Sequence, residues 1–310
     1  MAIRALHHVC LRARDLDGTR RFGEAFGLIP VAEIRGKVYL RGAGARAYLV
    51  TLEAADSSSL GSIAFETDSV EDLHNAIRQH GATPIRELGS PAGGVAVSLR
   101  DPEGVTIDLV HGVEPRAPDP VQNTLTLNQG YENKPRRGEF QVKAPLGPPQ
   151  LLRLGHVGLF TSNAAACSDW YGQVLGLIPS DLMYAGSPDN IVAGFFRINR
   201  GDEYVDHHTI ALFGMGSRGV HHMSFEVENA EVQFMAHRWL VSKGYESIWG
   251  VGRHPRGSHV FDVWRDPSGF RFETFSDTDL LNATEPTDRL PIESQQMDLW
   301  TDRSYEPYFA

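Results

Sequence analysis

The sequence predicts an α+β protein that contains two copies of one domain, each made of two strand–helix–strand halves. Three observations predict this fold class. Similar segments recur in the same order in both halves of the chain, which indicates an internal duplication. Each copy alternates segments that have the two-residue period of strands with segments that carry an apolar helical stripe. The length of 310 residues is enough for two domains of ordinary size.

The internal duplication rests on four landmark segments. In the first copy they are Leu6-His-His-Val9, residues 22–30, residues 62–66 and the turn Asp101-Pro-Glu-Gly104. Their counterparts are Leu154-Gly-His-Val157, residues 171–179, residues 222–226 and the turn Asp266-Pro-Ser-Gly269. Because the spacing between landmarks is larger in the second copy, we expect insertions in that copy.

The second copy shows the elements of one domain in order. They are a strand over residues 152–160, a helix over 164–175, short strands over 195–198 and 208–212, a strand over 220–227, a helix after Asn229, and a hairpin with strands over 260–264 and 270–275. Ser162 or Asn163 can cap the first helix and Gly176 can end it, whereas Asn229 and Gly244 bound the second helix. The first copy follows the same order over residues 3–110.

These elements predict an N-terminal domain over residues 1–112, a linker over 113–150 that is rich in proline and glycine, a C-terminal domain over 151–278 and a tail over 279–310. The tail is polar but carries four aromatic residues near its end, which are Trp300, Tyr305, Tyr308 and Phe309. It could fold back as a lid over a site, dock on a neighbouring subunit, or fray.

Composition narrows the class of protein. The formal net charge is −10 and no basic run occurs, so nucleic acids and anionic membranes are poor partners. No stretch of about 18 apolar residues predicts a transmembrane helix, and residues 1–11 lack a secretory signal core, so we expect a cytoplasmic protein. Two cysteines, Cys10 and Cys167, cannot form a disulfide framework and are expected to be packing thiols. Histidine is abundant, with 13 residues.

Candidate metal ligands occur on three predicted strands of the second copy. They are His156, one of the adjacent pair His221 and His222, and Glu273 in an apolar strand. A single histidine or glutamate in a strand is often structural, and Glu273 alone could lie on a solvated sheet face. Together, two imidazoles and a carboxylate form the facial triad that holds Fe(II) and leaves coordination positions open, and the same donors suit Mn(II).

The second copy resembles the two-domain extradiol ring-cleaving dioxygenases of the vicinal oxygen chelate superfamily, and the resemblance extends over both repeats, residues 3–278. The motifs that carry it are Leu154-Gly-His-Val157, His208-Thr-Ile-Ala-Leu212, Val220-His-His-Met-Ser-Phe225, Gly252-Arg-His254 and Asp266-Pro-Ser-Gly269 leading to Glu273. The resemblance implies tandem βαβββ modules, two in each domain, with strands curved around a central metal cavity in the C-terminal domain.

The resemblance also implies roles for individual residues. The metal ligands would be His156, His222 and Glu273. His222 is preferred to His221 because neighbouring strand residues point to opposite faces and the family's ligand is the second of the pair. His208 would take part in proton transfer and oxygen activation, with His207 pointing away, and His254 would contact the substrate.

One position departs from the family pattern. The family carries a tyrosine nine residues after the His254 position, where it hydrogen-bonds a substrate oxygen, and this chain has Val263 there. Strand alternation places His259 on the face of Val263, so His259 is a candidate replacement. The residues expected to line the substrate pocket are His254, His259, Val263, Phe196 and Tyr204.

The first copy has His8, Ser62 and Asp108 where the second copy has its three candidate ligands. Because serine is a poor Fe(II) ligand, we expect this domain to lack a metal and to support the other one.

The resemblance implies an extradiol, or meta-cleavage, dioxygenase that inserts both atoms of O2 into a substituted catechol or a related polyhydroxylated aromatic, with Fe(II) as the cofactor. Its partners would be a small aromatic diol, O2 and further copies of the chain in a homo-oligomer. Two alternatives stay open at this point: a metal-dependent lyase or isomerase on the same scaffold, and a non-catalytic protein that binds an aromatic compound and confers resistance.

Overall fold

The computed structural model describes residues 2–121, 128–138 and 146–310. Among these residues, no helix is long and apolar enough to span a membrane. Part of the predicted linker over 113–150 lies outside the described residues. Its described part contains an isolated bridge between Gln129 and Asn133.

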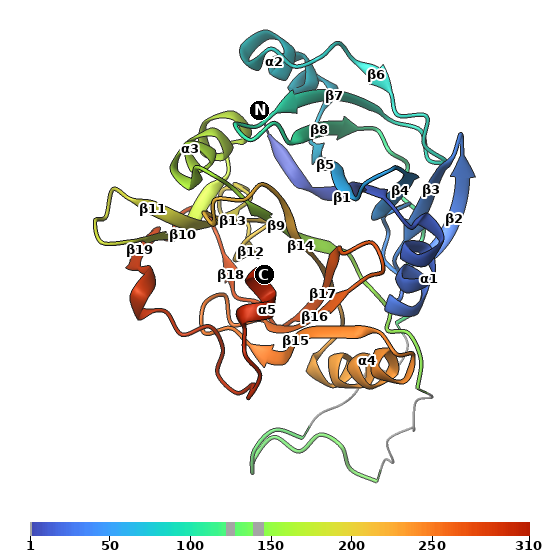
Figure 1. Ribbon diagram of the computed structural model, residues 1–310, viewed down its shortest axis with the longest axis vertical. Coiled ribbons are helices and arrows are strands. Elements are labelled where there is room, and N and C mark those ends of the chain that lie inside the picture. The colour runs from blue at the N-terminus through green and yellow to red at the C-terminus, as the bar shows by residue number, and fades with distance from the viewer. Residues whose placement is uncertain (1, 122–127, 139–145) are drawn as a thin grey trace.

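The N-terminal domain is one eight-stranded sheet covered by two helices (Figure 1). In chain order its elements are β1 (Ile3–Ala13), α1 (Leu16–Phe26), β2 (Ile29–Ile34), β3 (Lys37–Arg41), β4 (Val50–Ala54), β5 (Ser59–Thr67), α2 (Val70–His80), β6 (Arg86–Glu87), β7 (Val95–Arg100) and β8 (Thr106–His111). The first and last strands of each half pair in parallel, β1 with β4 and β5 with β8, and β1 pairs antiparallel with β5. Two βαβββ halves thus share one sheet.

The C-terminal domain repeats this plan in a nine-stranded sheet. The elements of this domain are β9 (Leu154–Phe160), α3 (Ala164–Leu175), β10 (Ile178–Tyr184), β11 (Ile191–Arg197), β12 (Val205–Asp206), β13 (Ile210–Phe213), β14 (Gly219–Glu226), α4 (Ala230–Ser242), β15 (Glu246–Arg253), β16 (Val260–Arg265) and β17 (Arg271–Ser276). Of these strands, β12 lies outside the sheet, whose ninth strand is β19 (Asp288–Pro291) of the tail. Strands β9 and β13 pair in parallel, as do β14 and β17, and β9 pairs antiparallel with β14. The predicted fold class, with two modules in each domain, is confirmed.

Local signals place the helices of the second domain as expected. The side chain of Asn163 caps α3 by accepting from the backbone N–H of Ala166, and Gly176 ends the helix in a left-handed conformation. Asn229 caps α4 in the same way by accepting from the N–H of Val232. The strands are less well predicted, because β10 and β15 were not expected from the sequence pattern.

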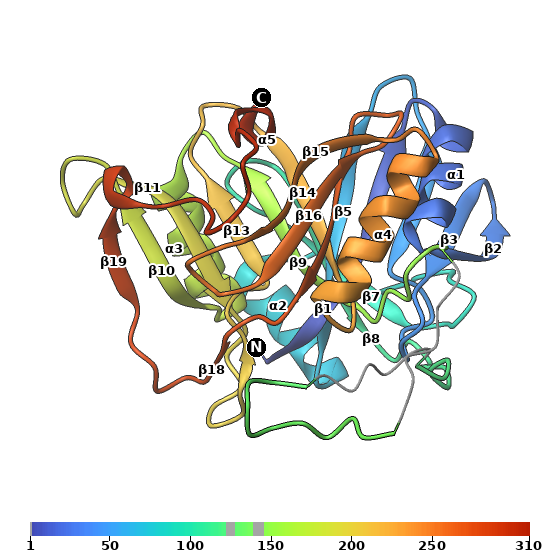
Figure 2. The same ribbon diagram turned by 90° about the horizontal axis from the view of Figure 1, so that it is seen from below.

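The duplicated Asp-Pro-x-Gly turns join the two domains. Thr19 of α1 donates to Asp266 Oδ2 at 2.5 Å, and Tyr171 of α3 donates to Asp101 Oδ2 at 3.1 Å. Each turn therefore holds a helix of the other domain. Figure 2 shows α1 beside α4, and the two helices are in contact. Buried apolar residues of both domains form one continuous core, so the domains pack as a unit.

The tail contains more structure than its polar sequence predicts. It adds β18 (Leu280–Leu281), which pairs with β12, and β19 (Asp288–Pro291), which extends the sheet beside β10. A short 3-10 turn (Ile292–Ser294) follows, and the tail ends in α5 (Glu306–Phe309), which contacts β15. Figure 1 shows α5 amid the strands of the C-terminal domain, so the tail returns to the part of this domain that carries the candidate ligands.

Candidate metal centre

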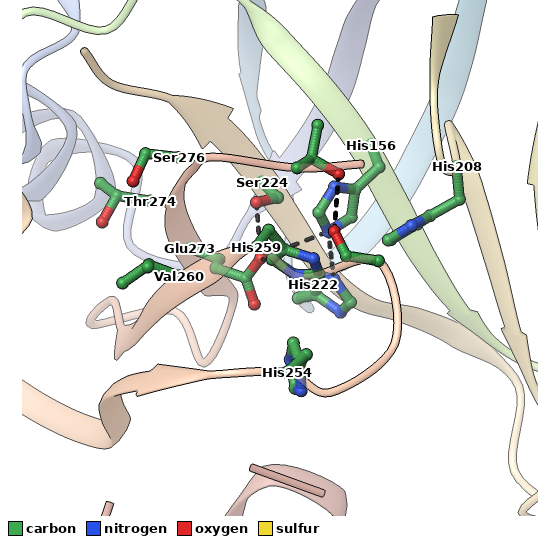
Figure 3. A network of polar contacts seen from close by, with 12 residues as sticks. His156, His208, His222, Ser224, His254, His259, Val260, Glu273, Thr274 and Ser276 are labelled. Carbon is green, nitrogen blue, oxygen red and sulfur yellow. Dashed lines mark hydrogen bonds and ion pairs between the residues drawn. The ribbon is translucent and has the colours of Figure 1, made fainter. Parts of the chain in front are cut away.

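Three adjacent strands bring together the side chains expected to bind a metal. His156 lies on β9, His222 on β14 and Glu273 on β17, and β14 is the middle strand of the three. Ser224 of β14 lies opposite both His156 and Glu273 in the strand register. Figure 3 shows the two rings and the carboxylate converging on one point. The parallel pairing of β14 with β17 therefore assembles donors that are far apart in the chain.

The distances and burial of these groups fit a bound divalent cation. His156 Nε2 lies 3.1 Å from His222 Nε2 and 3.3 Å from Glu273 Oε1. Burial lowers the pKa of His156 and of His222 to about 3, so both rings are neutral and can offer a lone pair. Glu273 is 0% exposed; Ser224 donates to its Oε1 at 2.6 Å, and its Oε2 has no hydrogen-bond partner among the described residues. A bound cation would stabilise a buried carboxylate in this state.

His259 is a second candidate for the third donor. Its Nε2 lies 3.9 Å from Glu273 Oε1, and the donor atoms of His156, His259 and Glu273 all lie within 4.8 Å of one another. Its Nδ1 has no hydrogen-bond partner among the described residues. Two possible donor sets therefore share His156 and Glu273, and differ in whether His222 or His259 completes them.

His208 lies next to this centre, with its ring centroid 4.2 Å from that of His156. The neighbouring His207 also lines the cavity, and its Nε2 is 3.2 Å from Asp181 Oδ2. The expectation that His207 points away is wrong, because both histidines precede β13 and strand alternation does not apply to them.

His254 follows the end of β15 and faces the same space (Figure 3). Its Nδ1 lies 2.7 Å from the backbone carbonyl oxygen of Met297, so Nδ1 carries the proton and donates. Its ring stacks on Phe261 with a centroid distance of 4.1 Å. In the neutral ring, Nε2 is left as an acceptor, and its orientation depends on Met297 of the tail.

A cavity of about 320 Å³ surrounds these groups. It is lined by residues of the C-terminal domain and the tail: His156, Met183, Val192, Ala193, Phe195, His207, His208, Phe213, Gly214, Met215, His222, His254, Pro255, Arg256, His259, Ile292, Gln295, Gln296, Met297, Tyr305, Tyr308 and Phe309. Most of the lining that is not histidine is apolar. Its size is at the lower end of the range for small-molecule sites.

Three residues expected in this lining lie elsewhere. Phe196 is buried in the main core, and its neighbour Phe195 faces the cavity instead. Tyr204 is 59% exposed on a loop outside the cavity. Val263 lies behind the lining, in a buried cluster with Trp249, Phe261 and Tyr308. Alternation predicts that Phe195 and Phe196 point to opposite faces, but it does not say which face is the cavity.

Tyr308 is a site residue that the sequence indicated only as one aromatic residue of a tail that could form a lid. It is buried in α5, its hydroxyl oxygen lies 3.2 Å from His222 Nδ1, and its ring packs on His221 with a centroid distance of 4.3 Å. Burial raises the pKa of Tyr308 well above its usual value, so the hydroxyl keeps its proton. The signal that could have found it is the cluster of aromatic residues in an otherwise polar tail.

The corresponding place in the N-terminal domain is occupied by internal contacts. His8 Nδ1 lies 2.8 Å from His7 Nδ1, and Arg86 and Ser98 donate to Asp108 Oδ1 at 2.8 and 2.5 Å. Of the residues that the structure describes, only a group in the C-terminal domain has at least three donor atoms close enough to share an ion. Asp108 Oδ1 is thus held by side chains of its own domain.

The buried His8 predicts acid sensitivity of the N-terminal domain. Burial lowers its pKa from 6.5 to about 3, so the unfolded chain takes up a proton that the folded chain excludes. Its contribution to stability is present above pH 6.5 and is lost as the pH falls toward 3. From pH 7 to pH 5, the metal-free protein should lose about 2 kcal/mol more free energy of unfolding than the His8→Gln variant.

Urea unfolding followed by circular dichroism at both pH values measures this difference. His74→Gln removes an exposed histidine and is the matched control, expected to behave as the wild type. Equal acid sensitivity of wild type and His8→Gln would show that His8 is not a buried neutral group.

The fold and the site together define the class of the protein. A model of the Glyoxalase/Bleomycin resistance protein/Dioxygenase superfamily matches residues 5–109 and 153–274, so the chain belongs to this superfamily. The predicted membership and the duplication of one domain are both confirmed.

Individual relatives are similar to nearly the whole chain. Metapyrocatechase 2 of Cupriavidus necator is 28% identical over 286 residues, which are 91% of this chain and 83% of the relative. Two solved structures share the fold. The Mn(II)-bound glyoxalase from Novosphingobium aromaticivorans has a TM-score of 0.78 at 22% sequence identity, and the match covers 97% of this chain and 91% of the glyoxalase chain. The 2,3-dioxygenase LapB from Pseudomonas sp. KL28 has a TM-score of 0.75 at 20% sequence identity, and the match covers 94% of this chain and 99% of the LapB chain.

Proposed function

We propose that this protein is an extradiol dioxygenase that opens the ring of a substituted catechol next to its two hydroxyl groups, with insertion of both atoms of O2. The observation that carries the proposal is the position of His222 Nε2 and Glu273 Oε1 at 3.1 and 3.3 Å from His156 Nε2, beside a cavity large enough for one aromatic ring. The activity agrees with the names of the relative Metapyrocatechase 2 and of the structural neighbour LapB.

We assign Fe(II) as the cofactor, held by His156, His222 and Glu273, with Mn(II) as the alternative that the same donors accommodate. When bound, Fe(II) supplies open coordination positions for the substrate oxygens and a redox-active centre, and its charge lowers the pKa of a bound hydroxyl. Glu273 offsets part of that charge, and Ser224 keeps the carboxylate oriented by donating to it.

The other histidines act on protons of the substrate. His208 faces the space beside His156 and is placed to accept a proton from a ring hydroxyl and to return it later. His254 presents Nε2 as an acceptor because Nδ1 donates to Met297, so it orients a substrate hydroxyl. The tail closes the cavity wall through Met297, Tyr308 and Phe309, and in this role as a lid it limits the access of water.

The lining favours a catechol with an uncharged, apolar substituent. Apolar side chains, among them Met183, Phe195 and Ile292, face the cavity away from the histidines. Arg256 is the cation among the described lining residues, and its charge is already matched by Asp288 at 2.6 Å, with Asp181 at 3.7 Å. A carboxylate on the substrate would therefore be buried without a free partner.

Oxygen uptake with a panel of diols tests this function. Fe(II)-loaded protein should consume O2 and form a yellow ring-fission product with 3-methylcatechol, 4-methylcatechol or 2,3-dihydroxybiphenyl. The kcat/KM for 3,4-dihydroxybenzoate should be at least about tenfold lower, because about 1.4 kcal/mol of unpaired charge burial is enough for that factor. The metal-free protein is the control.

Absence of O2 uptake with every diol, from protein that holds one equivalent of iron, would contradict the proposal. It would favour a lyase or isomerase, or a protein that only binds aromatic compounds. The expected homo-oligomer and cytoplasmic location stay predictions.

A further inference from the structure

The hydroxyl of Tyr308 is a polar group of the cavity wall, and the proposed function assigns it no role. It belongs to α5 at the end of the tail, and the side chain lines the cavity although the residue is buried. Among the described residues, its recorded hydrogen-bond partner is His222 Nδ1, at 3.2 Å. The direction of that hydrogen bond decides what the hydroxyl can do.

The direction follows from the tautomer of His222. If Nε2 offers its lone pair to a cation shared with His156, the proton of the neutral ring is on Nδ1. An Nδ1–H group donates a hydrogen bond and cannot accept one. His222 Nδ1 therefore donates either to the Tyr308 hydroxyl oxygen or to His221 Nδ1, which lies 2.6 Å away. In both cases the proton of the Tyr308 hydroxyl has no acceptor among the described residues. A buried donor in this state is destabilising until an acceptor enters the cavity.

The position of this hydroxyl is held from several sides. The Tyr308 ring lies between His221 and Trp249, with centroid distances of 4.3 and 5.1 Å, and packs in the same buried cluster as Val263. The next residues are also held, because the Arg271 guanidinium donates to the backbone carbonyl oxygen of Ala310. Arg271 is on β17, two residues before Glu273, so the strand that carries the carboxylate also anchors the end of the tail.

We propose that Tyr308 donates a hydrogen bond to an oxygen of the catechol and so positions the substrate beside the metal centre. The proposal rests on the proposed function, because a catechol oxygen is the acceptor that it requires. Val263 lies opposite Glu273 in the register of β16 and β17, and it packs in the same buried cluster as the Tyr308 ring. The C-terminal tail thus contributes a polar group to the site as well as part of the wall.

The test compares wild type with Tyr308→Phe, which removes the hydroxyl and keeps the ring. Both proteins are loaded with one equivalent of Fe(II) without oxygen, and metal content is measured first. Titration with 4-nitrocatechol, whose absorbance changes as it loses protons, then gives a Kd. In the fraction that holds Fe(II), the variant should bind 4-nitrocatechol about tenfold more weakly than the wild type, the usual effect of one lost hydrogen bond. With 4-methylcatechol and O2, KM should rise more than kcat falls.

Tyr131→Phe is the matched control, because Tyr131 is 89% exposed in the linker, and it should leave all three quantities unchanged. Equal affinity of wild type and Tyr308→Phe for 4-nitrocatechol would overturn the proposal. Loss of metal with unchanged catechol affinity in the loaded fraction would also overturn it, since Tyr308 would then only orient His222. Failure of the proposed function has a different signature: loaded wild type would neither bind 4-nitrocatechol nor consume O2.

Discussion

Replacement of His222 by Gln, or of Glu273 by Gln, is expected to abolish metal binding and ring cleavage. Each change removes one of three proposed donors, since His222 Nε2 and Glu273 Oε1 lie 3.1 and 3.3 Å from the third, His156 Nε2. The loss in metal affinity should exceed the roughly 10–100-fold that removal of an outer partner of a ligand causes. Metal content after dialysis against a chelator, together with O2 uptake, measures both effects.

His259→Gln is the informative counterpart, because His259 is the other possible third donor. We expect this variant to retain the metal and to be impaired only in its handling of the substrate. His8→Gln, in the N-terminal domain, should retain metal and activity. If His259→Gln lost the metal while His222→Gln kept it, the ligand set would be His156, His259 and Glu273.

Gly158→Ala is expected to disturb the metal centre without removing any donor. Gly158 pairs with His222 across β9 and β14, and a Cβ at this position would lie 2.4 Å from both Cε1 and Nδ1 of the His222 ring. The ring would have to turn or move, and its Nε2 would leave the position 3.1 Å from His156. We expect metal affinity to fall by about 10–100-fold, as it does when the orientation of a ligand is lost. Equilibrium titration against a competing chelator measures the change.

Gly147→Ala is the matched control, because a Cβ at Gly147 meets nothing within 4 Å. Melting curves of the metal-free proteins separate a local effect from general destabilisation. Unchanged metal affinity in Gly158→Ala would mean that metal binding does not depend on the position of the His222 ring against Gly158.

The candidate donors could be selected from the sequence because they stand out from local patterns. His156, His222 and Glu273 each interrupt an apolar strand, and strands alternate their side chains between two faces. The capped ends of α3 were predictable for the same reason, since Asn163 and Gly176 act within one helical turn. The duplication of these patterns along the chain also indicated that one domain is repeated.

The lining of the cavity was harder to predict. Phe195 and Phe196 have equivalent sequence patterns, and only the packing of the sheet shows that Phe195 faces the cavity. His207 and His208 both line it because the chain before β13 is irregular and has no alternation to separate them. Neither outcome follows from the order of residues within a segment.

The fold class of this protein is determined by local sequence patterns, whereas the full composition of its site is decided by tertiary packing. Fold class and duplication follow from the residues alone, because helix caps, turns and alternation act over a few positions, and the resemblance to the family indicated His156, His222 and Glu273 as candidate donors. The placement of Tyr308 beside His222, and of His259 within reach of Glu273, was decided by tertiary packing. The physical reason is distance along the chain: α5 reaches the site only because its aromatic residues pack against β15 and the strands around it, contacts that no local pattern encodes.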